Sequence, residues 1–271
     1  MGTLSDYATT KLVDHVFKTA YSPVATLYIA LCTAAPTAAS TGSTITQTNY
    51  TGYTRASFTA SSFNAAATRK IVQALDITFP QASSVSGSNI THYAICDAST
   101  AGNMLAFGSF NSSWNVVSGN TPKVAAAQIE ISIGASSGAG FTDYSVHQML
   151  NLMFRNVAWS TPSTSIHFGL TTATLTDSST SGTEPSGNAY AREPVPASSF
   201  DAASAGVTTN NTAITFDTPS GTWGTITSII IMNALTTGNM LAYDNSNVVD
   251  QIVNSGDTVQ ISIGAFDCNL D

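Results

Sequence analysis

The chain has 271 residues, only 9% of them charged, and a formal net charge of −8. Globular proteins usually carry about 25% charged residues, so a Ser- and Thr-rich surface is expected, which suits a β-rich particle protein better than a cytosolic enzyme. The eight basic residues are scattered along the sequence, which argues against a nucleic-acid partner because phosphate binding needs a clustered basic face.

The first predicted element is an amphipathic helix near the N-terminus. Thr3 and Asp6 have the spacing of a capping box at its start, and Ser22-Pro23 follows its end. We expect its apolar stripe to pack against the sheet of its own domain, with a partner-binding face as the alternative. The residues that mark the stripe are Leu4, Tyr7, Leu12, Val13, Val16 and Phe17.

Strands follow this helix. Leu27, Ile29 and Leu31 alternate with Tyr28 and Ala30, which is the period of a half-buried strand. The polar stretch at 33–51 is longer than most connections in compact domains, so it is expected to be a functional or a disordered loop. Further strands are predicted at 53–59, 71–79, 90–96, 104–110 and 127–133.

The sequence then repeats itself, because TLSDYATTKLVDHVF at 3–17 resembles GFTDYSVHQMLNLMF at 140–154. The motif Ile-Ser-Ile-Gly-Ala at 131–135 recurs at 261–265, so Cys268 is interpreted as part of a tail that the first half lacks. Thr161-Pro162 is expected to follow the second helical region. The remaining predictions for the second half are a strand at 166–170, a loop at 171–188 and strands at 190–195, 207–216, 226–232, 240–245 and 258–263.

A repeat of this length matches a whole domain, since solenoid units run only about 20–50 residues. We predict a mainly β protein with two tandem, similar antiparallel β-sandwich domains, Ig-like or jelly-roll-like, each opening with one amphipathic α-helix. The small-residue linker at 134–140 places the first domain at 1–137 and the second at 138–271.

The duplication tests which reactive groups both domains need. None of the four histidines and none of the three cysteines is kept in both halves, and the cysteines lack metal-binding or disulfide spacing. No nucleophile motif, phosphate loop or calcium loop is visible. The sequence therefore predicts no catalytic, cofactor-binding or metal-binding residue, no cofactor and no enzymatic activity.

The groups that both halves keep are structural. Arg55 and Arg192 each follow a tyrosine by two positions. We predict that they pair with Asp6 and Asp143 and so anchor helix to sheet, with simple surface exposure as the alternative. Hairpin turns are predicted where Gly and Asn, which tolerate positive φ, stand between strands. These turns are Gly102-Asn103 and Gly238-Asn239.

Several segments resemble a family of bacteriophage structural proteins. LSDYATTKLVDHVF is similar to its opening L-x-x-Y-x-x-x-L-L-D-H-x-F, ATLYIALCTAAPT to T-x-Y-x-A-L-x-T-x-x-P-T, and GYTRASFT to its G-x-Y-x-R segment. A fourth match runs from Thr91 to Leu105, with Cys96 in place of the usual phenylalanine. The resemblance implies a non-enzymatic virion protein, often labelled tail-fibre-like. Members usually have a single unit, so the tandem form is a departure.

Two placements on the particle compete. We expect a capsid decoration or cement protein that stabilises the head, because two compact domains suit stapling and the chain lacks the repetitive segments of a fibre shaft. The alternative is a tail, baseplate or fibre component whose Ser/Thr-rich loops contact the host surface. A third reading is a carbohydrate-binding module, in which Trp223 is expected to be exposed. Its candidate stacking residues are Tyr28, Tyr50, Tyr53, Trp114, Trp159 and Trp223.

The expected partners are other virion proteins, either the major capsid protein or tail proteins, and further copies of the chain in a homo-oligomer such as a trimer. A glycan of the host surface is a further candidate. No nucleic-acid partner is expected, because the basic residues are scattered. No membrane partner is expected either, because the N-terminus lacks the pattern of a signal peptide and no apolar run approaches a membrane span. The expected location is the virion, after synthesis in the host cytoplasm.

Overall fold

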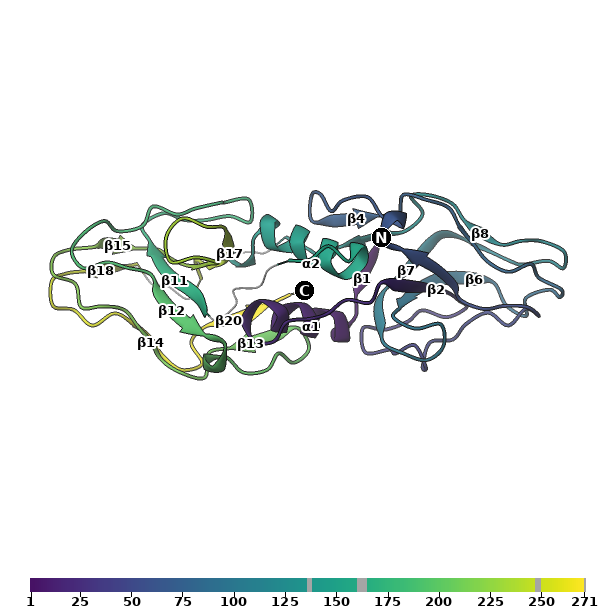
Figure 1. Ribbon diagram of the computed structural model, residues 1–271, viewed down its shortest axis with the longest axis horizontal. Coiled ribbons are helices and arrows are strands. Elements are labelled where there is room, and N and C mark those ends of the chain that lie inside the picture. The colour runs from purple at the N-terminus through teal and green to yellow at the C-terminus, as the bar shows by residue number, and fades with distance from the viewer. Residues whose placement is uncertain (136–137, 160–164, 247–249, 271) are drawn as a thin grey trace. The chain divides into compact units, whose positions relative to one another are not determined.

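The computed structural model describes residues 1–135, 138–159, 165–246 and 250–270 (Figure 1). The chain forms two compact units. They differ from the predicted domains 1–137 and 138–271, which we call repeat 1 and repeat 2, because each unit takes in part of the other repeat's helix. The predicted boundary after residue 137 and the helix end at Thr161-Pro162 lie outside the described residues. Unit 1 comprises Met1–Thr9, Ser22–Ile133 and His147–Ala158, and unit 2 comprises Thr10–Tyr21, Gly134–Val146 and Trp159–Asp271.

Unit 1 is built on a seven-stranded sheet in the order β3-β2-β6-β7-β1-β9-β4. Neighbouring strands pair antiparallel, except that β1 and β9 are parallel. A second sheet of two strands joins β5 to β8, and a short 3-10 helix, η1 (Ala60–Ser62), follows β3. The strands are β1 (Gly2–Leu4), β2 (Thr26–Cys32), β3 (Ala56–Thr59), β4 (Lys70–Val72), β5 (Ile77–Thr78), β6 (Ile90–Cys96), β7 (Met104–Trp114), β8 (Lys123–Val124) and β9 (Glu130–Ser132).

Unit 2 has a five-stranded antiparallel sheet in the order β10-β17-β16-β11-β12. Three small sheets pair β13 with β20, β14 with β19 and β15 with β18, and η2 (Ala197–Ser199) follows β12. The strands are β10 (Ala139–Phe141), β11 (Ser165–Thr171), β12 (Glu193–Pro196), β13 (Val207–Thr209), β14 (Ile214–Thr215), β15 (Gly224–Ile226), β16 (Ser228–Met232), β17 (Met240–Asp244), β18 (Gln251–Val253), β19 (Gln260–Ile261) and β20 (Asp267–Asn269).

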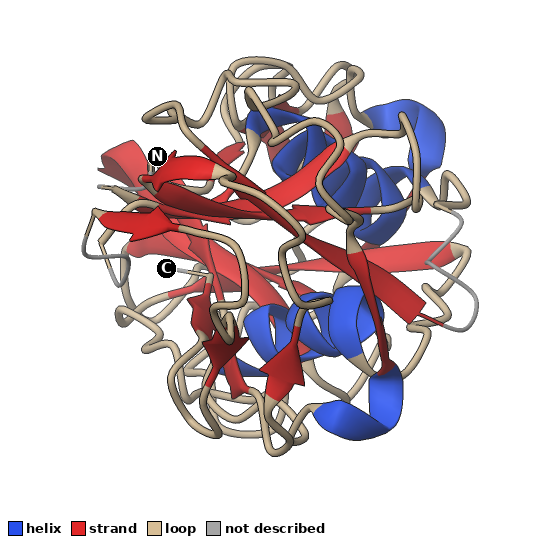
Figure 2. Cartoon of the chain, turned by 90° about the vertical axis from the view of Figure 1, so that its left-hand side faces the viewer, coloured by secondary structure: helices blue, strands red, loops and turns tan. Residues whose placement is uncertain are grey.

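One α-helix opens each repeat, α1 (Asp6–Phe17) and α2 (Asp143–Arg155). Strands and loops make up most of the rest (Figure 2). The structure confirms the predicted class, a mainly β protein with two similar repeats whose layered sheets are consistent with β-sandwiches. A membrane span needs about 20 residues, and no helix in the described part of the chain is long and apolar enough to cross a bilayer.

Each helix begins at a hydroxyl cap. The Ser5 hydroxyl accepts the Ala8 N–H at 3.2 Å, and the Thr142 hydroxyl accepts the Ser145 N–H at 3.3 Å. Both hydroxyls also donate to backbone carbonyls of the sheet, so each cap joins its helix to a strand. The predicted capping box is wrong, because Thr3 lies in β1, where it pairs with β7.

The central strands are buried on both faces. Ile29 and Leu31 are fully buried, as the alternation predicts, but Ala30 and Cys32 on the opposite face are fully buried too. Ile45 packs on that second face, and it comes from the loop at 33–51. In unit 2, Leu175 of the loop at 172–188 packs in a cluster with four residues of β16 and β17. These two segments, which we call the long loops, therefore form a layer over the sheet.

The C-terminal strands reveal how the repeats correspond. Ile131 of β9 pairs with Ile71 of β4, and Cys268 of β20 pairs with Thr208 of β13 in the same way. Cys268 is therefore the counterpart of Ile131 in the core, and its assignment to an extra tail was wrong. The recurring motif at 261–265 suggested the tail, but that segment begins in β19, which pairs with β14.

Candidate functional site

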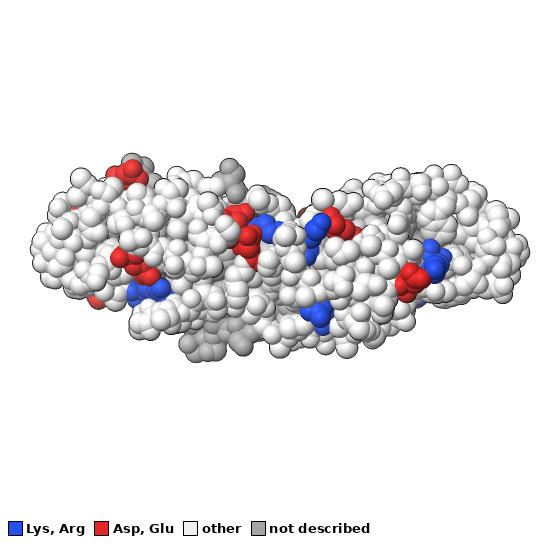
Figure 3. Space-filling view, turned by 90° about the horizontal axis from the view of Figure 1, so that it is seen from above, with Lys and Arg blue, Asp and Glu red and all other residues white. Residues whose placement is uncertain are grey.

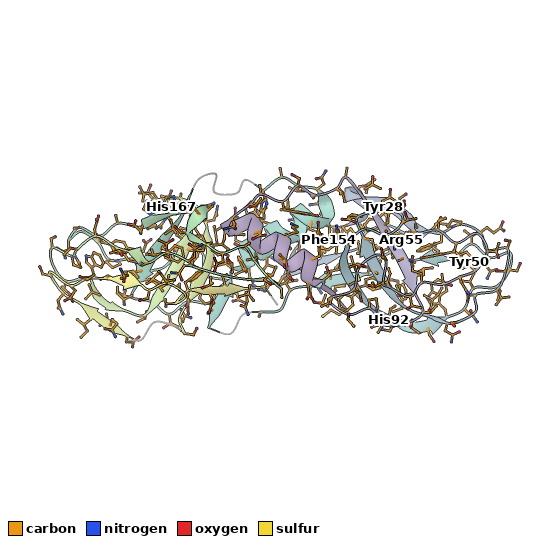
Figure 4. The ribbon with its side chains drawn as sticks, turned by 90° about the horizontal axis from the view of Figure 1, so that it is seen from below. Tyr28, Tyr50, Arg55, His92, Phe154 and His167 are labelled. Atoms are coloured by element: carbon orange, nitrogen blue, oxygen red, sulfur yellow. The ribbon has the colours of Figure 1, made fainter. Side chains whose placement is uncertain are left out.

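The clearest polar cluster of unit 1 surrounds Arg55, which is only 7% exposed (Figure 4). Its guanidinium donates to Gln47 Oε1 at 3.1 Å, to the carbonyls of Ala98 and Ala101 at 2.9 Å each, and to the carbonyl of Gly42. Gln47 and Gly42 belong to the long loop of repeat 1, whereas Ala98 and Ala101 lie between β6 and β7. One side chain therefore ties the long loop to the hairpin, an arrangement that we call the arginine clamp.

Arg192 forms the second arginine clamp. It donates from Nη1 to the carbonyls of Ala234 and Thr237, at 2.8 and 2.7 Å. Its Nε and Nη2 donate to the Glu184 carboxylate, with a shortest distance of 2.6 Å. The two side chains are 9% and 21% exposed, so this ion pair is largely withdrawn from water. Glu184 stands where repeat 1 has the neutral Gln47.

The predicted partners Asp6 and Asp143 are not among the acceptors of these arginines. The reason is that each guanidinium lies at the junction of loop and hairpin, where turn carbonyls need donors, while both acids lie in the first turn of a helix. Sequence reasoning missed Gln47 and Glu184. Their common spacing, eight positions before an arginine, was the signal that could have found them.

A tyrosine supports each clamp. The Tyr53 hydroxyl accepts an N–H of β2 at 2.9 Å and donates to Gln47 Oε1 at 3.1 Å. The Tyr190 hydroxyl accepts an N–H of β11 at 2.9 Å and donates to Glu184 Oε2 at 2.8 Å. Burial raises the pKa of both hydroxyls above the ordinary value of 10.0, so both stay protonated and keep donating.

The hairpin turns require glycine on two grounds. Their glycines have φ of 73° and 81°, and an added Cβ would lie 2.5 Å from a side-chain oxygen of Asp97 or Asn233. That oxygen accepts the N–H of the following asparagine at 2.7 Å in each turn, so it cannot easily move away. The residues that occupy these turn positions are Gly102-Asn103 and Gly238-Asn239.

Charged side chains are sparse elsewhere, and they form isolated patches on the face in Figure 3. Lys70 pairs with Glu130 at 2.9 Å and Lys123 with Asp76 at 2.8 Å. These side chains are between 27% and 51% exposed, and such exposed pairs contribute little to stability. The ion pair of the second clamp is less exposed than either of these two pairs.

The two clamps differ in loop length. Thirteen positions separate Thr33 and Thr46, which share a backbone hydrogen bond, and eleven separate Thr172 and Thr183, which share the equivalent bond. The longer loop places Gly42 against the hairpin, where its N–H donates to a turn carbonyl at 3.0 Å. In repeat 2 a pocket of about 410 Å³ lies beside the clamp. The pocket is lined by residues that include Glu184, Pro185, Tyr190, Arg192, Leu235 and Thr237.

Three of the aromatic residues considered as sugar-stacking platforms are buried. Trp223 is 4% exposed, contrary to prediction, because its turn is hydrogen-bonded to Asn188 at the end of the long loop of repeat 2. Its indole N–H donates to the Asn188 carbonyl at 2.9 Å, and its ring contacts Tyr190 at a centroid distance of 5.2 Å. Tyr50 and Trp159 are buried as well, so these three faces cannot receive a sugar ring.

The cysteines are free thiols of the core. Burial raises the pKa of Cys32 to about 12 and that of Cys96 to about 11, and it also raises the pKa of Cys268. Protonated, buried thiols are poor nucleophiles and poor metal ligands. Within the described residues, no three or more His, Cys, Asp or Glu side chains gather where they could hold a metal ion.

The fold and the clamps define a class, that of a mainly β protein with two similar tandem repeats. A family model described as "Podophage GP4 fiber I protein gp80" matches residues 3–132 and matches again at 140–269. The chain belongs to this family, and it is a bacteriophage virion structural protein with a tandem duplication, as the sequence resemblance implied. No curated protein matches the chain.

Proposed function

We propose that the chain is a non-enzymatic component of a virion fibre that presents its long loops to the host surface. The observation that carries this proposal is the fibre-family match over both repeats. The arginine clamps support it, because both repeats keep a device for holding loops and neither keeps a shared reactive group. Capsid decoration, the placement first expected from the sequence, stays as the alternative.

In this proposal the clamps pre-organise the loops. A loop that is already held by hydrogen bonds loses little conformational freedom on binding, so less of the contact energy goes into ordering it. The partners would be other fibre or tail proteins and further copies of the chain. A homo-oligomer such as a trimer also belongs to this proposal. Sedimentation of the purified chain would measure its order.

Copy number on the particle tests the placement. Quantitative mass spectrometry of purified virions would give the ratio of this chain to the major capsid protein, and antibody labelling would locate it. A fibre component should occur in a few copies set by the symmetry of the tail and should label one vertex. Labelling over the whole head, with a copy number that follows the capsomers, would contradict the fibre proposal and favour decoration.

The pocket in repeat 2 makes glycan binding a second candidate function. It combines the apolar side chains of Leu235 and Pro185 with the hydroxyl of Thr237 and the polar groups of the clamp. Sugars are recognised by such mixtures of apolar contact and hydrogen bonding. Repeat 1 has Gly42 against its hairpin instead, so we assign the glycan contact to repeat 2 alone.

A pair of leucine variants tests this pocket. Leu235 is 51% exposed and lines it, whereas Leu75 is 53% exposed and does not. Leu235→Arg should weaken binding of the purified chain to host cells or to a glycan array by roughly tenfold or more, which is the loss of about 1.4 kcal/mol. Leu75→Arg should bind like wild type. Equal binding by both variants would remove the glycan reading and leave the fibre assignment untouched.

A further inference from the structure

Each helix passes from one compact unit into the other. Unit 1 contains Met1–Thr9, but the rest of α1 lies within Thr10–Tyr21 of unit 2. Likewise, α2 begins within Gly134–Val146 of unit 2 and continues within His147–Ala158 of unit 1. Each compact unit therefore contains residues of both repeats.

Three positions of α1, and the residue after its last turn, contact repeat 2. Asp14 Oδ1 accepts the Ala203 N–H at 2.8 Å, and the Thr10 hydroxyl accepts the Gly206 N–H at 3.2 Å. Lys18 donates to the carbonyl of Phe200. Phe17 packs into an aromatic cluster of unit 2 and is only 2% exposed. Figure 1 shows α1 beside β13 and β20 of that unit. The rings that Phe17 contacts are Phe141, Phe200 and Phe266, at centroid distances of 6.0, 5.2 and 5.9 Å.

The same positions of α2 contact repeat 1. Asn151, the counterpart of Asp14, accepts the Ala66 N–H on Oδ1 at 3.0 Å. His147, the counterpart of Thr10, accepts the Arg69 N–H on Nε2 at 3.0 Å. Phe154, the counterpart of Phe17, packs on Phe63 at 5.9 Å and is 1% exposed. It lies among the strands of unit 1 in Figure 4.

The receiving loops also correspond. The residues contacted in repeat 1 and in repeat 2 stand 137 positions apart, as Phe63 with Phe200, Ala66 with Ala203 and Arg69 with Gly206. The helix side chains changed from Asp to Asn and from Thr to His, yet each still accepts the same backbone N–H. This agreement at three paired positions indicates an exchange that belongs to the fold and not to one repeat.

We infer that the chain is a tethered pair in which each repeat supplies the helix that completes the core of the other repeat. The surface that receives the helix is the loop at 63–69 in repeat 1 and at 200–206 in repeat 2. The partner that fits it is a helix from another repeat of this family. The linker near residue 134 is then dispensable for holding the two repeats together.

Cutting the linker of the full-length protein tests this inference. Gly134 and Ala135 are exposed, so a recognition sequence for a specific protease can be inserted between them. After cleavage, denaturing electrophoresis should show two fragments, while native mass spectrometry and size exclusion should show one complex with the mass of the uncut chain. Two separate, folded fragments would overturn the inference.

Polar variants show whether the exchanged helices cause the association. In the cut protein, Asp14→Ala with Asn151→Ala removes one acceptor from each exchanged helix and should weaken the complex by roughly tenfold. A control pair, Asp257→Ala with Asn49→Ala, also removes one side-chain acceptor of a backbone N–H from each repeat, but each of these acceptors serves its own repeat. It should leave the complex unchanged. Equal weakening by both pairs would refute the exchange as its cause.

Discussion

Each repeat has a buried arginine that joins the long loop to the hairpin, but the two arginines have different acceptors. Arg55 meets only neutral hydrogen-bond acceptors, whereas Arg192 meets a carboxylate. A buried charge needs compensation. Turn carbonyls provide it in repeat 1, including that of Gly42 in the longer loop. The carboxylate of Glu184 provides it in repeat 2, where the loop is shorter.

Arg192 should therefore need the negative charge of Glu184, whereas Arg55 needs no carboxylate. Glu184→Gln keeps the size and an acceptor oxygen but leaves Arg192 without an opposite charge. We expect a loss of about 1–2 kcal/mol in the free energy of unfolding, measured by urea denaturation. The matched exchange Gln47→Glu should leave stability unchanged or raise it by about 1 kcal/mol. A neutral result for Glu184→Gln would contradict this account of the clamp.

At the scale of elements, the end of α1 is held by a neutral histidine. His15 Nδ1 accepts the Tyr21 N–H at 2.9 Å, and Nε2 lies 3.3 Å from the Trp159 carbonyl, to which it donates. Burial lowers the pKa of His15 below its ordinary value of 6.5, although the Trp159 carbonyl opposes the shift. Protonation would put a proton on Nδ1 and remove the acceptor for Tyr21. The counterpart in α2 is Leu152, which is also buried.

This histidine should make stability fall in mild acid. Its folded-state pKa lies below the unfolded value, so the unfolded chain binds the proton first as the pH drops. The contribution of His15 to stability is fully present above pH 6.5 and is lost below it by about 1.4 kcal/mol per pH unit until the folded histidine also titrates. His15→Leu, which copies repeat 2, should abolish that contribution. Thermal unfolding of both proteins between about pH 7.5 and 5.5 measures the difference, and parallel curves would argue against it.

Most elements could be predicted from the sequence because their periodicity is local. Both helices and the strands at 26–32 and 90–96 follow from apolar spacing. The short strands β1, β8, β10, β18 and β20 were missed, since two or three residues carry too little pattern. The long loops were expected to be functional or disordered. Their packing on the sheet depends on single residues such as Ile45, which no periodicity marks.

The clamp was predicted only in part for a similar reason. The spacing of Tyr53 and Arg55, repeated as Tyr190 and Arg192, identified the arginines correctly as shared groups. Their acceptors are mostly backbone carbonyls, which every residue carries, so sequence could not indicate them. The choice of Asp6 as a partner assumed that opposite charges meet, and the hairpin carbonyls took its place.

At the scale of the whole molecule, the helix exchange was invisible in the sequence. The apolar stripe of α1 was expected to pack on the sheet of its own domain. An amphipathic helix packs equally well on either of two similar sheets, because both present the same kind of apolar surface. The polar contacts of each helix with the receiving loop, such as those of Asp14 and Asn151, appear in the structure alone.

The exchange has a consequence for the timing of synthesis. Domains usually fold in order as they leave the ribosome, at about 5–20 residues per second. Unit 1 includes His147–Ala158, so its core stays incomplete after the whole of repeat 1 has emerged. Until α2 emerges, the nascent first half therefore exposes the apolar site that receives this helix. During that time, helices of other nascent chains on the same mRNA compete for the site.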